Sequence, residues 1–116
     1  MTPQFLDQTF GALADGTRRA IVARLSEHES LPVSDLAEPF DMSLPAVMKH
    51  LGVLERAGMI SRTKVGRRVE CRMIPDSMKD ALDWLTQHEA FWNRKLDALA
   101  AFLEAQPDDA ANEENQ

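Results

Sequence analysis

The chain has 116 residues, of which 44% are hydrophobic and 28% charged, and its formal net charge is −6. This length fits one domain of common size, and the composition is that of an ordinary soluble globular protein. No apolar run approaches the roughly 18 residues of a membrane span, and the first residues lack the basic and apolar regions of a secretory signal. The single cysteine, Cys71, cannot form an internal disulfide. We therefore expect a cytoplasmic protein with no membrane partner.

The negative charge is distributed unevenly along the chain. Residues 43–72 carry seven basic and two acidic side chains, which gives +5, whereas residues 1–42 and 73–116 carry −4 and −7. Salt screens charges that lie more than roughly 8–10 Å apart, so a polyanion responds to the local excess rather than to the total. The acidic balance therefore does not exclude nucleic acid as a partner.

Three helices are expected in the first 40 residues. Apolar residues at near-helical spacing predict a helix over 3–14, and Asp15 has the side chain of an N-cap for a second helix that ends near Ser26. Residues 27–32 are expected to form a loop, and a short third helix is predicted over 33–40. Its inward positions are expected to be Leu36, Ala37 and Phe40.

A fourth helix is predicted over residues 43–57. Ser43 is a strong N-cap candidate, Pro45 is tolerated because it lies in the first turn, and Gly58 can supply a left-handed C-cap. Apolar residues spaced by three and four predict one narrow inward stripe, formed by Val47, Leu51 and Leu54. The opposite face has no acidic residue before Glu55; it carries Leu44, Pro45, Met48, Lys49 and Gly52.

A hairpin is predicted over residues 60–73. Val69, Cys71 and Met73 alternate with polar residues, which is typical of a half-buried strand, and residues 60–65 pair with it across a turn that contains Gly66. An inward-facing Cys71 is expected to be a structural thiol rather than a redox sensor. Basic side chains gather on this hairpin, namely Arg62, Lys64, Arg67 and Arg68.

The last helix is predicted to be long, since residues 76–105 contain no glycine or proline. About thirty helical residues span roughly 45 Å, and the apolar face is too wide for one side of a monomer, so it requires a partner. Residues 106–116 are acidic and polar and are expected to be disordered. The domain is accordingly assigned to residues 1–105, followed by a tail over 106–116.

The order of these elements predicts a winged helix-turn-helix: mainly α with a small β-hairpin, about five helices plus a two-stranded wing. In such a fold the second helix of the motif reads the DNA major groove, and a basic hairpin beside it reaches phosphates. The residues expected to contact double-stranded DNA are Ser43, Leu44, Pro45, Met48, Lys49, His50, Arg62, Lys64, Arg67 and Arg68.

Four segments in order resemble winged-helix repressors of the ArsR/SmtB type: residues 10–19 (FGALADGTRR), 43–51 (SLPAVMKHL), 54–60 (LERAGMI) and 65–68 (VGRR). The resemblance implies a bacterial homodimer, joined through its first and last helices, that represses transcription at a palindromic operator. The interface residues that this implies are Phe5, Phe10, Trp84, Leu85, Phe91, Trp92, Leu96 and Leu99. Met48 stands where the family often has serine, which leaves the preferred base sequence open. Gly16 stands where the family often has proline, which should only loosen the start of the second helix.

The metal ligands of that family are missing here. Residues 31–36 contain no cysteine, and the last helix offers His88 beside Glu89, which as adjacent helical residues do not face the same way. We expect no metal, no cofactor and, without a phosphate-binding glycine loop or a nucleophile motif, no enzyme activity. The alternatives are a metal-responsive repressor with a site between subunits, and a dimerisation or protein-interaction module that does not bind DNA. The effector, a small molecule or a protein, is open; the aromatic residues of the last helix could line a pocket for a small apolar inducer.

Overall fold

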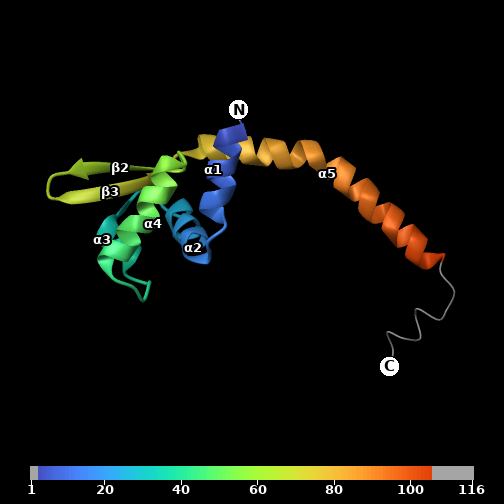
Figure 1. The fold of residues 1–116 in the computed structure, drawn as a ribbon. Helices are drawn as coiled ribbons and strands as arrows, with labels where there is room; N and C mark the ends of the chain where they lie inside the picture. The colour runs from blue at the N-terminus through green and yellow to red at the C-terminus, as the bar shows by residue number, and fades with distance from the viewer. Residues whose placement is uncertain (1–2, 106–116) are drawn as a thin grey trace, which may run out of the picture. The chain divides into compact units, whose positions relative to one another are not determined.

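Five helices and three short strands make up the part of the chain that the computed structural model describes, residues 3–105 (Figure 1). In chain order they are α1 (Pro3–Leu13), α2 (Gly16–Ser26), β1 (Leu31–Pro32), α3 (Val33–Ala37), α4 (Leu44–Arg56), β2 (Ile60–Val65), β3 (Arg68–Met73) and α5 (Pro75–Glu104). The predicted mainly helical class with a wing is confirmed. The chain divides into two units, residues 1–82 and 83–116. The predicted tail, 106–116, lies outside the described residues.

The sheet contains the predicted two-stranded wing, β2 and β3, and corrects the loop predicted over residues 27–32, because the last two of these residues form a third strand. Residues expected to form a loop supply β1, and the strand order is β1-β3-β2, all antiparallel. Leu31 lies opposite Cys71, and Pro32 lies opposite Glu70. A strand of two residues is too short to show an alternating pattern, and Pro32 is tolerated because an edge strand does not need every N–H group.

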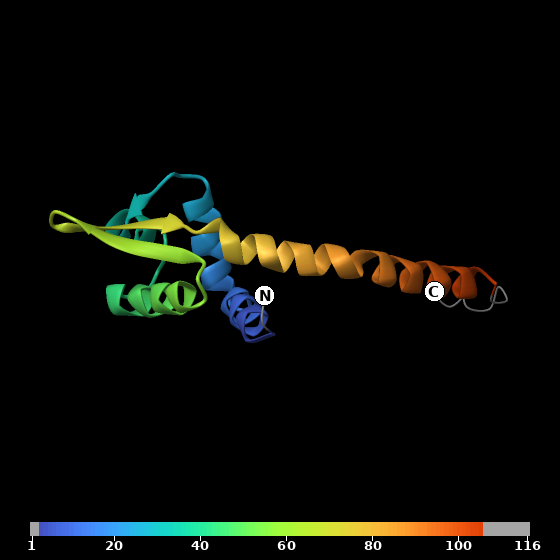
Figure 2. The same cartoon turned by 90° about the horizontal axis from the view of Figure 1, so that it is seen from above.

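The hairpin of β2 and β3 has the register that alternation predicts. Ile60 pairs with Met73 and Arg62 with Cys71, and both Ile60 and Cys71 are fully buried on the face turned toward the helices. The turn places Gly66 at φ +63°, the conformation that a two-residue turn requires of its first central residue. Seen from above, the hairpin runs past α3 and α4 to its tip (Figure 2).

The third helix is shorter than predicted, because it ends at Ala37 instead of Phe40. Pro39 has no N–H group to donate to the carbonyl of Asp35, four residues earlier, so the helix cannot continue. That carbonyl accepts a hydrogen bond from Arg24 Nη2 of α2 instead, at 3.2 Å. The predicted inward position Leu36 is fully buried, while Ala37 and Phe40 are partly buried.

The predicted stripe of α4 forms the centre of the core. Val47, Leu51 and Leu54 are fully buried in one cluster with Ile21 and Leu25 of α2. Burying a side chain of this size contributes about 1.5–3 kcal/mol, so the stripe decides which side of α4 faces inward. Ser43 caps the helix as predicted, its Oγ accepting from the N–H group of Ala46 at 3.3 Å.

The chain leaves α4 through a left-handed glycine that meets the first turn of α5. Gly58 has φ +73°, as the predicted C-cap requires, and an added Cβ there would lie 3.1 Å from Ser77 Oγ. The buried Ser77 hydroxyl lies 3.0 Å from the carbonyl oxygen of Ala57 and 3.1 Å from that of Gly58, so it donates to the end of α4. This contact fixes where α5 begins.

Within the second unit, the described residues 83–105 form the remainder of α5 and present many apolar side chains to solvent. Eight large ones are between 38% and 61% exposed, namely Trp84, Leu85, Phe91, Trp92, Leu96, Leu99, Phe102 and Leu103. Rings pack along the helix: Trp84 stacks on His88 at 4.2 Å, and Phe91 meets Trp92 edge-on at 5.4 Å. Among the described residues, no helix is long and apolar enough to cross a membrane.

Truncating two leucines of α4 is expected to show which face supports the fold. Leu51→Ala should lower the free energy of unfolding by about 2–5 kcal/mol, because it opens a cavity in the core. Leu44→Ala, the same change on the same helix at a side chain that is 54% exposed, should change it by no more than about 0.5 kcal/mol. Urea unfolding followed by circular dichroism measures both, and equal losses would contradict the assigned orientation of α4.

Candidate nucleic-acid interface

The outward side of α4 presents the residues that the sequence predicts for base reading. Ser43, Leu44, Pro45 and Lys49 are exposed at its first two turns, and Met48 is partly buried beside them. No acidic residue lies in the first turn, so the partial positive charge of the helix N-terminus is not offset there. Across a shared hollow, Leu44 and Met48 face the predicted wing contacts Arg67 and Arg68. The structure thus gathers most of the predicted set on one surface.

His50 is one of two exceptions, because its imidazole is held by the start of α2. His50 Nδ1 lies 3.4 Å from Arg18 Nη1 and 3.8 Å from Asp15 Oδ2. A guanidinium group only donates hydrogen bonds, so Nδ1 accepts from Arg18 in the tautomer that carries the ring proton on Nε2. That N–H group is the donor His50 can offer, and a contact of His50 with DNA stays a prediction.

Two arginines that the sequence reading did not assign tie the α1–α2 corner together. Arg18 Nε donates to the carbonyl of Ala12 at 2.7 Å and Arg18 Nη2 to that of Gly11 at 3.2 Å, while Arg19 Nη1 donates to the carbonyl of Leu13 at 2.7 Å. These are last-turn carbonyls of α1, which have no partner within that helix. Basic residues in the first turn of a helix are unfavourable for its dipole. Their presence at positions 18 and 19 is the feature of the sequence that could have indicated a role in capping the preceding helix.

Asp15 completes the corner as the N-cap that the sequence predicts. Its Oδ2 accepts from the N–H group of Arg18 at 3.0 Å. This hydrogen bond, together with the charge of Arg18, holds the pKa of Asp15 below its usual value. The corner therefore joins α1, α2 and α4 through four polar side chains, Asp15, Arg18, Arg19 and His50, the last of which belongs to α4.

Arg62, one of the predicted wing contacts, is paired with an acid of α4. Its Nη2 donates to Glu55 Oε1 at 2.8 Å, which raises the pKa of Arg62 and lowers that of Glu55. The pair links the last turn of α4 to β2 and so helps to hold the wing beside the helix. It also means that one of the seven basic side chains of residues 43–72 is neutralised by one of the two acidic ones, a balance that the net charge of +5 already contains.

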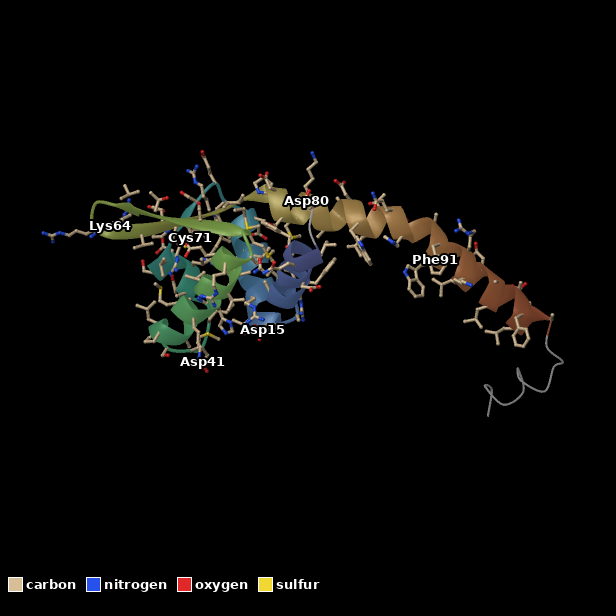
Figure 3. All side chains as sticks on the ribbon, turned by 45° about the horizontal axis from the view of Figure 1, so that its top comes forward. Asp15, Asp41, Lys64, Cys71, Asp80 and Phe91 are labelled. Carbon is tan, nitrogen blue, oxygen red and sulfur yellow. The ribbon has the colours of Figure 1, made fainter. Side chains whose placement is uncertain are left out.

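Three of the other six basic side chains of this segment lie at the tip end of the hairpin, whereas Lys49 and Arg56 lie on α4 and Arg72 lies on β3. Lys64 extends away from the protein, and Arg67 occupies the turn itself (Figure 3). Arg68 is exposed and lies 3.6 Å from Glu70, a long pair on the surface that contributes little. Exposed cations at the end of a projecting hairpin are suited to phosphate contacts that do not depend on sequence.

The side chains that the structure describes do not fit a metal centre within one chain. Among residues 3–105, no three His, Cys, Asp or Glu side chains lie together as a metal requires. His88 Nδ1 is 2.8 Å from the carbonyl oxygen of Trp84, so this nitrogen is already engaged. Burial raises the pKa of the Cys71 thiol, which disfavours the thiolate that binds metals.

Comparison with known proteins gives relatives along most of the chain. A family model described as a helix-turn-helix domain matches residues 13–63. The HTH-type transcriptional regulator Rv2034 of Mycobacterium tuberculosis is 40% identical over 103 residues, 89% of this chain and 92% of the relative. The arsenical resistance operon repressor of Escherichia coli is 41% identical over 68 residues, 59% of this chain and 58% of that protein. The crystal structure of an ArsR family transcriptional regulator, RHA00566, is 41% identical with a TM-score of 0.74, covering 80% of this chain and 95% of that chain.

The buried thiol gives a chemical test of the hairpin. Native Cys71 should react with iodoacetamide far more slowly than an exposed thiol, and raising the pH to about 8.5 should accelerate it little, because its raised pKa keeps it protonated. In urea it should react at the ordinary rate. Mass spectrometry measures the rates, and Thr63→Cys in a Cys71→Ala background supplies an exposed thiol on the same hairpin. Equal rates for Cys71 and for the introduced thiol, both measured in folded protein, would refute the inward register of β3.

Proposed function

This chain belongs to the ArsR family of winged helix-turn-helix transcriptional regulators, and from that premise we propose that it is a homodimeric repressor that binds a palindromic operator. The family consists of DNA-binding regulators and not of enzymes. One observation carries the proposal: with its stripe of Val47, Leu51 and Leu54 buried, α4 turns Leu44, Pro45 and Lys49 outward, beside a hairpin whose tip is positively charged. The protein acts where its DNA target lies, in the cytoplasm.

In this mechanism α4 enters the major groove with its N-terminal turns against the bases. Lys49 donates to guanine or to a phosphate, and the apolar side chains Leu44, Pro45 and Met48 contact thymine methyl groups. Ser43 donates to a phosphate at the helix N-terminus, where the backbone N–H groups also favour an anion. Lys64 and Arg67, with Arg68 beside them, attract the neighbouring backbone whatever its sequence.

The dimer is proposed to form through α5 and α1. The second half of α5 has an apolar stripe that would stay exposed to water in a monomer. Trp92, at the middle of this stripe, is 59% exposed. Phe5 of α1 is 48% exposed and joins the proposed interface with Phe10. Two copies related by a twofold axis present two copies of α4, which is the symmetry that a palindromic operator matches.

Binding to the DNA upstream of the protein's own gene tests the proposal. Fluorescence anisotropy with labelled duplexes should show specific binding whose affinity falls steeply between about 50 and 200 mM salt. A duplex of the same length with shuffled sequence is the control. A dimerisation module without DNA-binding function would bind neither duplex at any salt concentration.

Substitutions on α4 and on the wing should separate base reading from backbone attraction. Lys49→Ala and Met48→Ala should each change the ranking of operator variants, at a cost of about 1–3 kcal/mol on the preferred sequence. Arg67→Ala should weaken binding to all sequences alike and reduce the salt slope by about 1 for each protomer. Anisotropy titrations on a panel of operator variants measure both effects. An unchanged affinity and salt slope in Arg67→Ala would refute the assignment of the wing.

A charge placed in the apolar stripe of α5 should separate the protomers. Trp92→Glu is expected to give a monomer by light scattering and to lose tight operator binding, because a carboxylate cannot be buried unpaired in an apolar interface. Asn93→Glu adds the same charge at the adjacent exposed position and should leave the dimer intact. A Trp92→Glu protein that remains dimeric would refute the proposed interface.

A further inference from the structure

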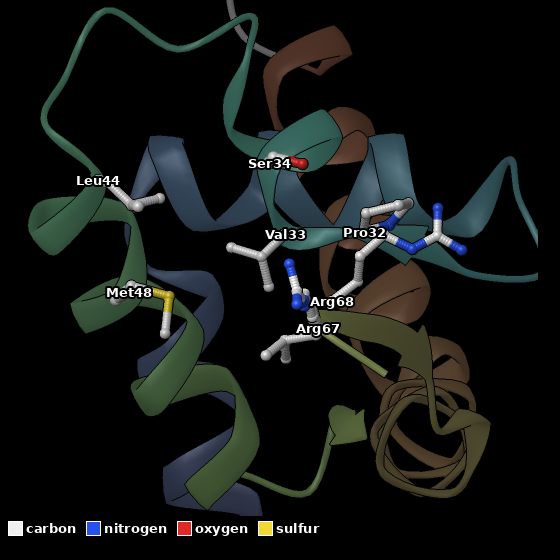
Figure 4. A pocket seen from close by; sticks show the side chains of 8 residues that line it. Pro32, Val33, Ser34, Leu44, Met48, Arg67 and Arg68 are labelled. Atoms are coloured by element: carbon white, nitrogen blue, oxygen red, sulfur yellow. The ribbon is translucent and has the colours of Figure 1, made fainter. Parts of the chain in front are cut away.

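A hollow of about 340 Å³ lies between α4 and the wing, within the first unit (Figure 4). Leu44 and Met48 of α4 form one wall, and Pro32 with Val33 forms the opposite one. The hairpin closes the third side with Arg67 and its neighbours. Three elements from separate parts of the chain therefore converge on one cavity.

The lining combines apolar walls with positively charged side chains, those of Arg67 and Arg68. Most lining side chains are hydrocarbon or thioether, and none of the lining residues is acidic. Among residues 3–105, Arg67 has no ion-pair partner, whereas neighbouring Arg68 already lies 3.6 Å from Glu70. A guanidinium group beside an apolar surface is complementary to a carboxylate that carries an apolar body.

The size of the hollow limits the occupant to a small molecule. Ligand pockets range from about 300 to 1,000 Å³, so this cavity is near the lower end. Met48 supplies one wall, and its flexible side chain can adapt to different apolar shapes. Ser34 offers a hydroxyl at the rim as a second polar contact.

We propose that this hollow binds a small organic carboxylate with an apolar body, and that this ligand displaces DNA. The inference rests on the proposed function, because Leu44, Met48 and Arg67 are assigned to DNA contact there. A ligand in the hollow covers the two apolar side chains and neutralises the arginine of the wing. Ligand and operator then compete for the same side chains, and the carboxylate acts as an inducer.

Octanoate is the probe for direct binding, with octan-1-ol and acetate as matched controls. In ¹³C-methyl NMR spectra, octanoate should shift the methyl signals of Val33, Leu44 and Met48 in a saturable way. Octan-1-ol, which lacks the charge, should bind with an affinity at least about tenfold lower than that of octanoate. Acetate, which lacks the apolar body, should not bind. No saturable shift with octanoate, or equal affinity for octan-1-ol, would overturn the proposal.

A pair of identical substitutions four residues apart locates the site. Ser34→Phe fills the rim of the hollow and should weaken octanoate binding by about tenfold or more. Ser30→Phe adds the same ring to a residue that lines a polar hollow beside Thr63 and Glu70, and it should bind octanoate as the wild type does. The methyl spectra report whether each variant is folded, and equal affinity in both folded variants would overturn the assigned location.

Competition with DNA is measured on the same proteins. Octanoate should release labelled operator from the wild type and from Ser30→Phe, while Ser34→Phe should hold the operator at the same octanoate concentration. Operator that stays bound at saturating octanoate would overturn the inducer role. If no variant binds DNA even without octanoate, the proposed function fails, and the methyl titration still decides separately whether the carboxylate site exists.

Discussion

The inward orientation of α4 is the constraint on which the rest of the domain depends. Val47, Leu51 and Leu54 lose all contact with water in the core, and a helix cannot turn without exposing them. Everything proposed for the opposite face follows from this, since the outward direction of Leu44 and Lys49 is set by what lies beneath them. The core thus determines the rotation of α4 about its own axis, and through it which side chains face outward.

Polar contacts then hold α4 at its middle and in its last turn. Near the middle, His50 meets Arg18 and Asp15 at the α1–α2 corner, and in the last turn Glu55 pairs with Arg62 of β2. These side chains have charges that a count along the sequence assigns to DNA binding or to solvent. In the structure they link α4 to its neighbours, and Lys49 and the cations of the hairpin tip are left for the proposed DNA contacts.

The regular elements and their caps could be predicted, because local patterns determine them: the spacing of the α4 stripe, the N-caps Asp15 and Ser43, and Gly58. The failures have two different causes. Strand β1 exists because Leu31 meets Cys71, forty residues later, whereas α3 stops at Ala37 because of the nearby Pro39, a local signal that the prediction of a helix to Phe40 overlooked. For the candidate site, residue type and position predicted the surface, whereas the pairing of Arg62 and the hollow beside Met48 depend on tertiary packing.

The Ser77 hydroxyl has a mechanical consequence. It bonds to the last carbonyls after α4 at the point where α5 begins, and Gly58 leaves no room for a larger side chain between them. The start of α5 therefore cannot swivel unless these hydrogen bonds break or the end of α4 moves with it. The first turn of α5 and the C-terminal end of α4 are therefore coupled, and a rotation of the one displaces the other.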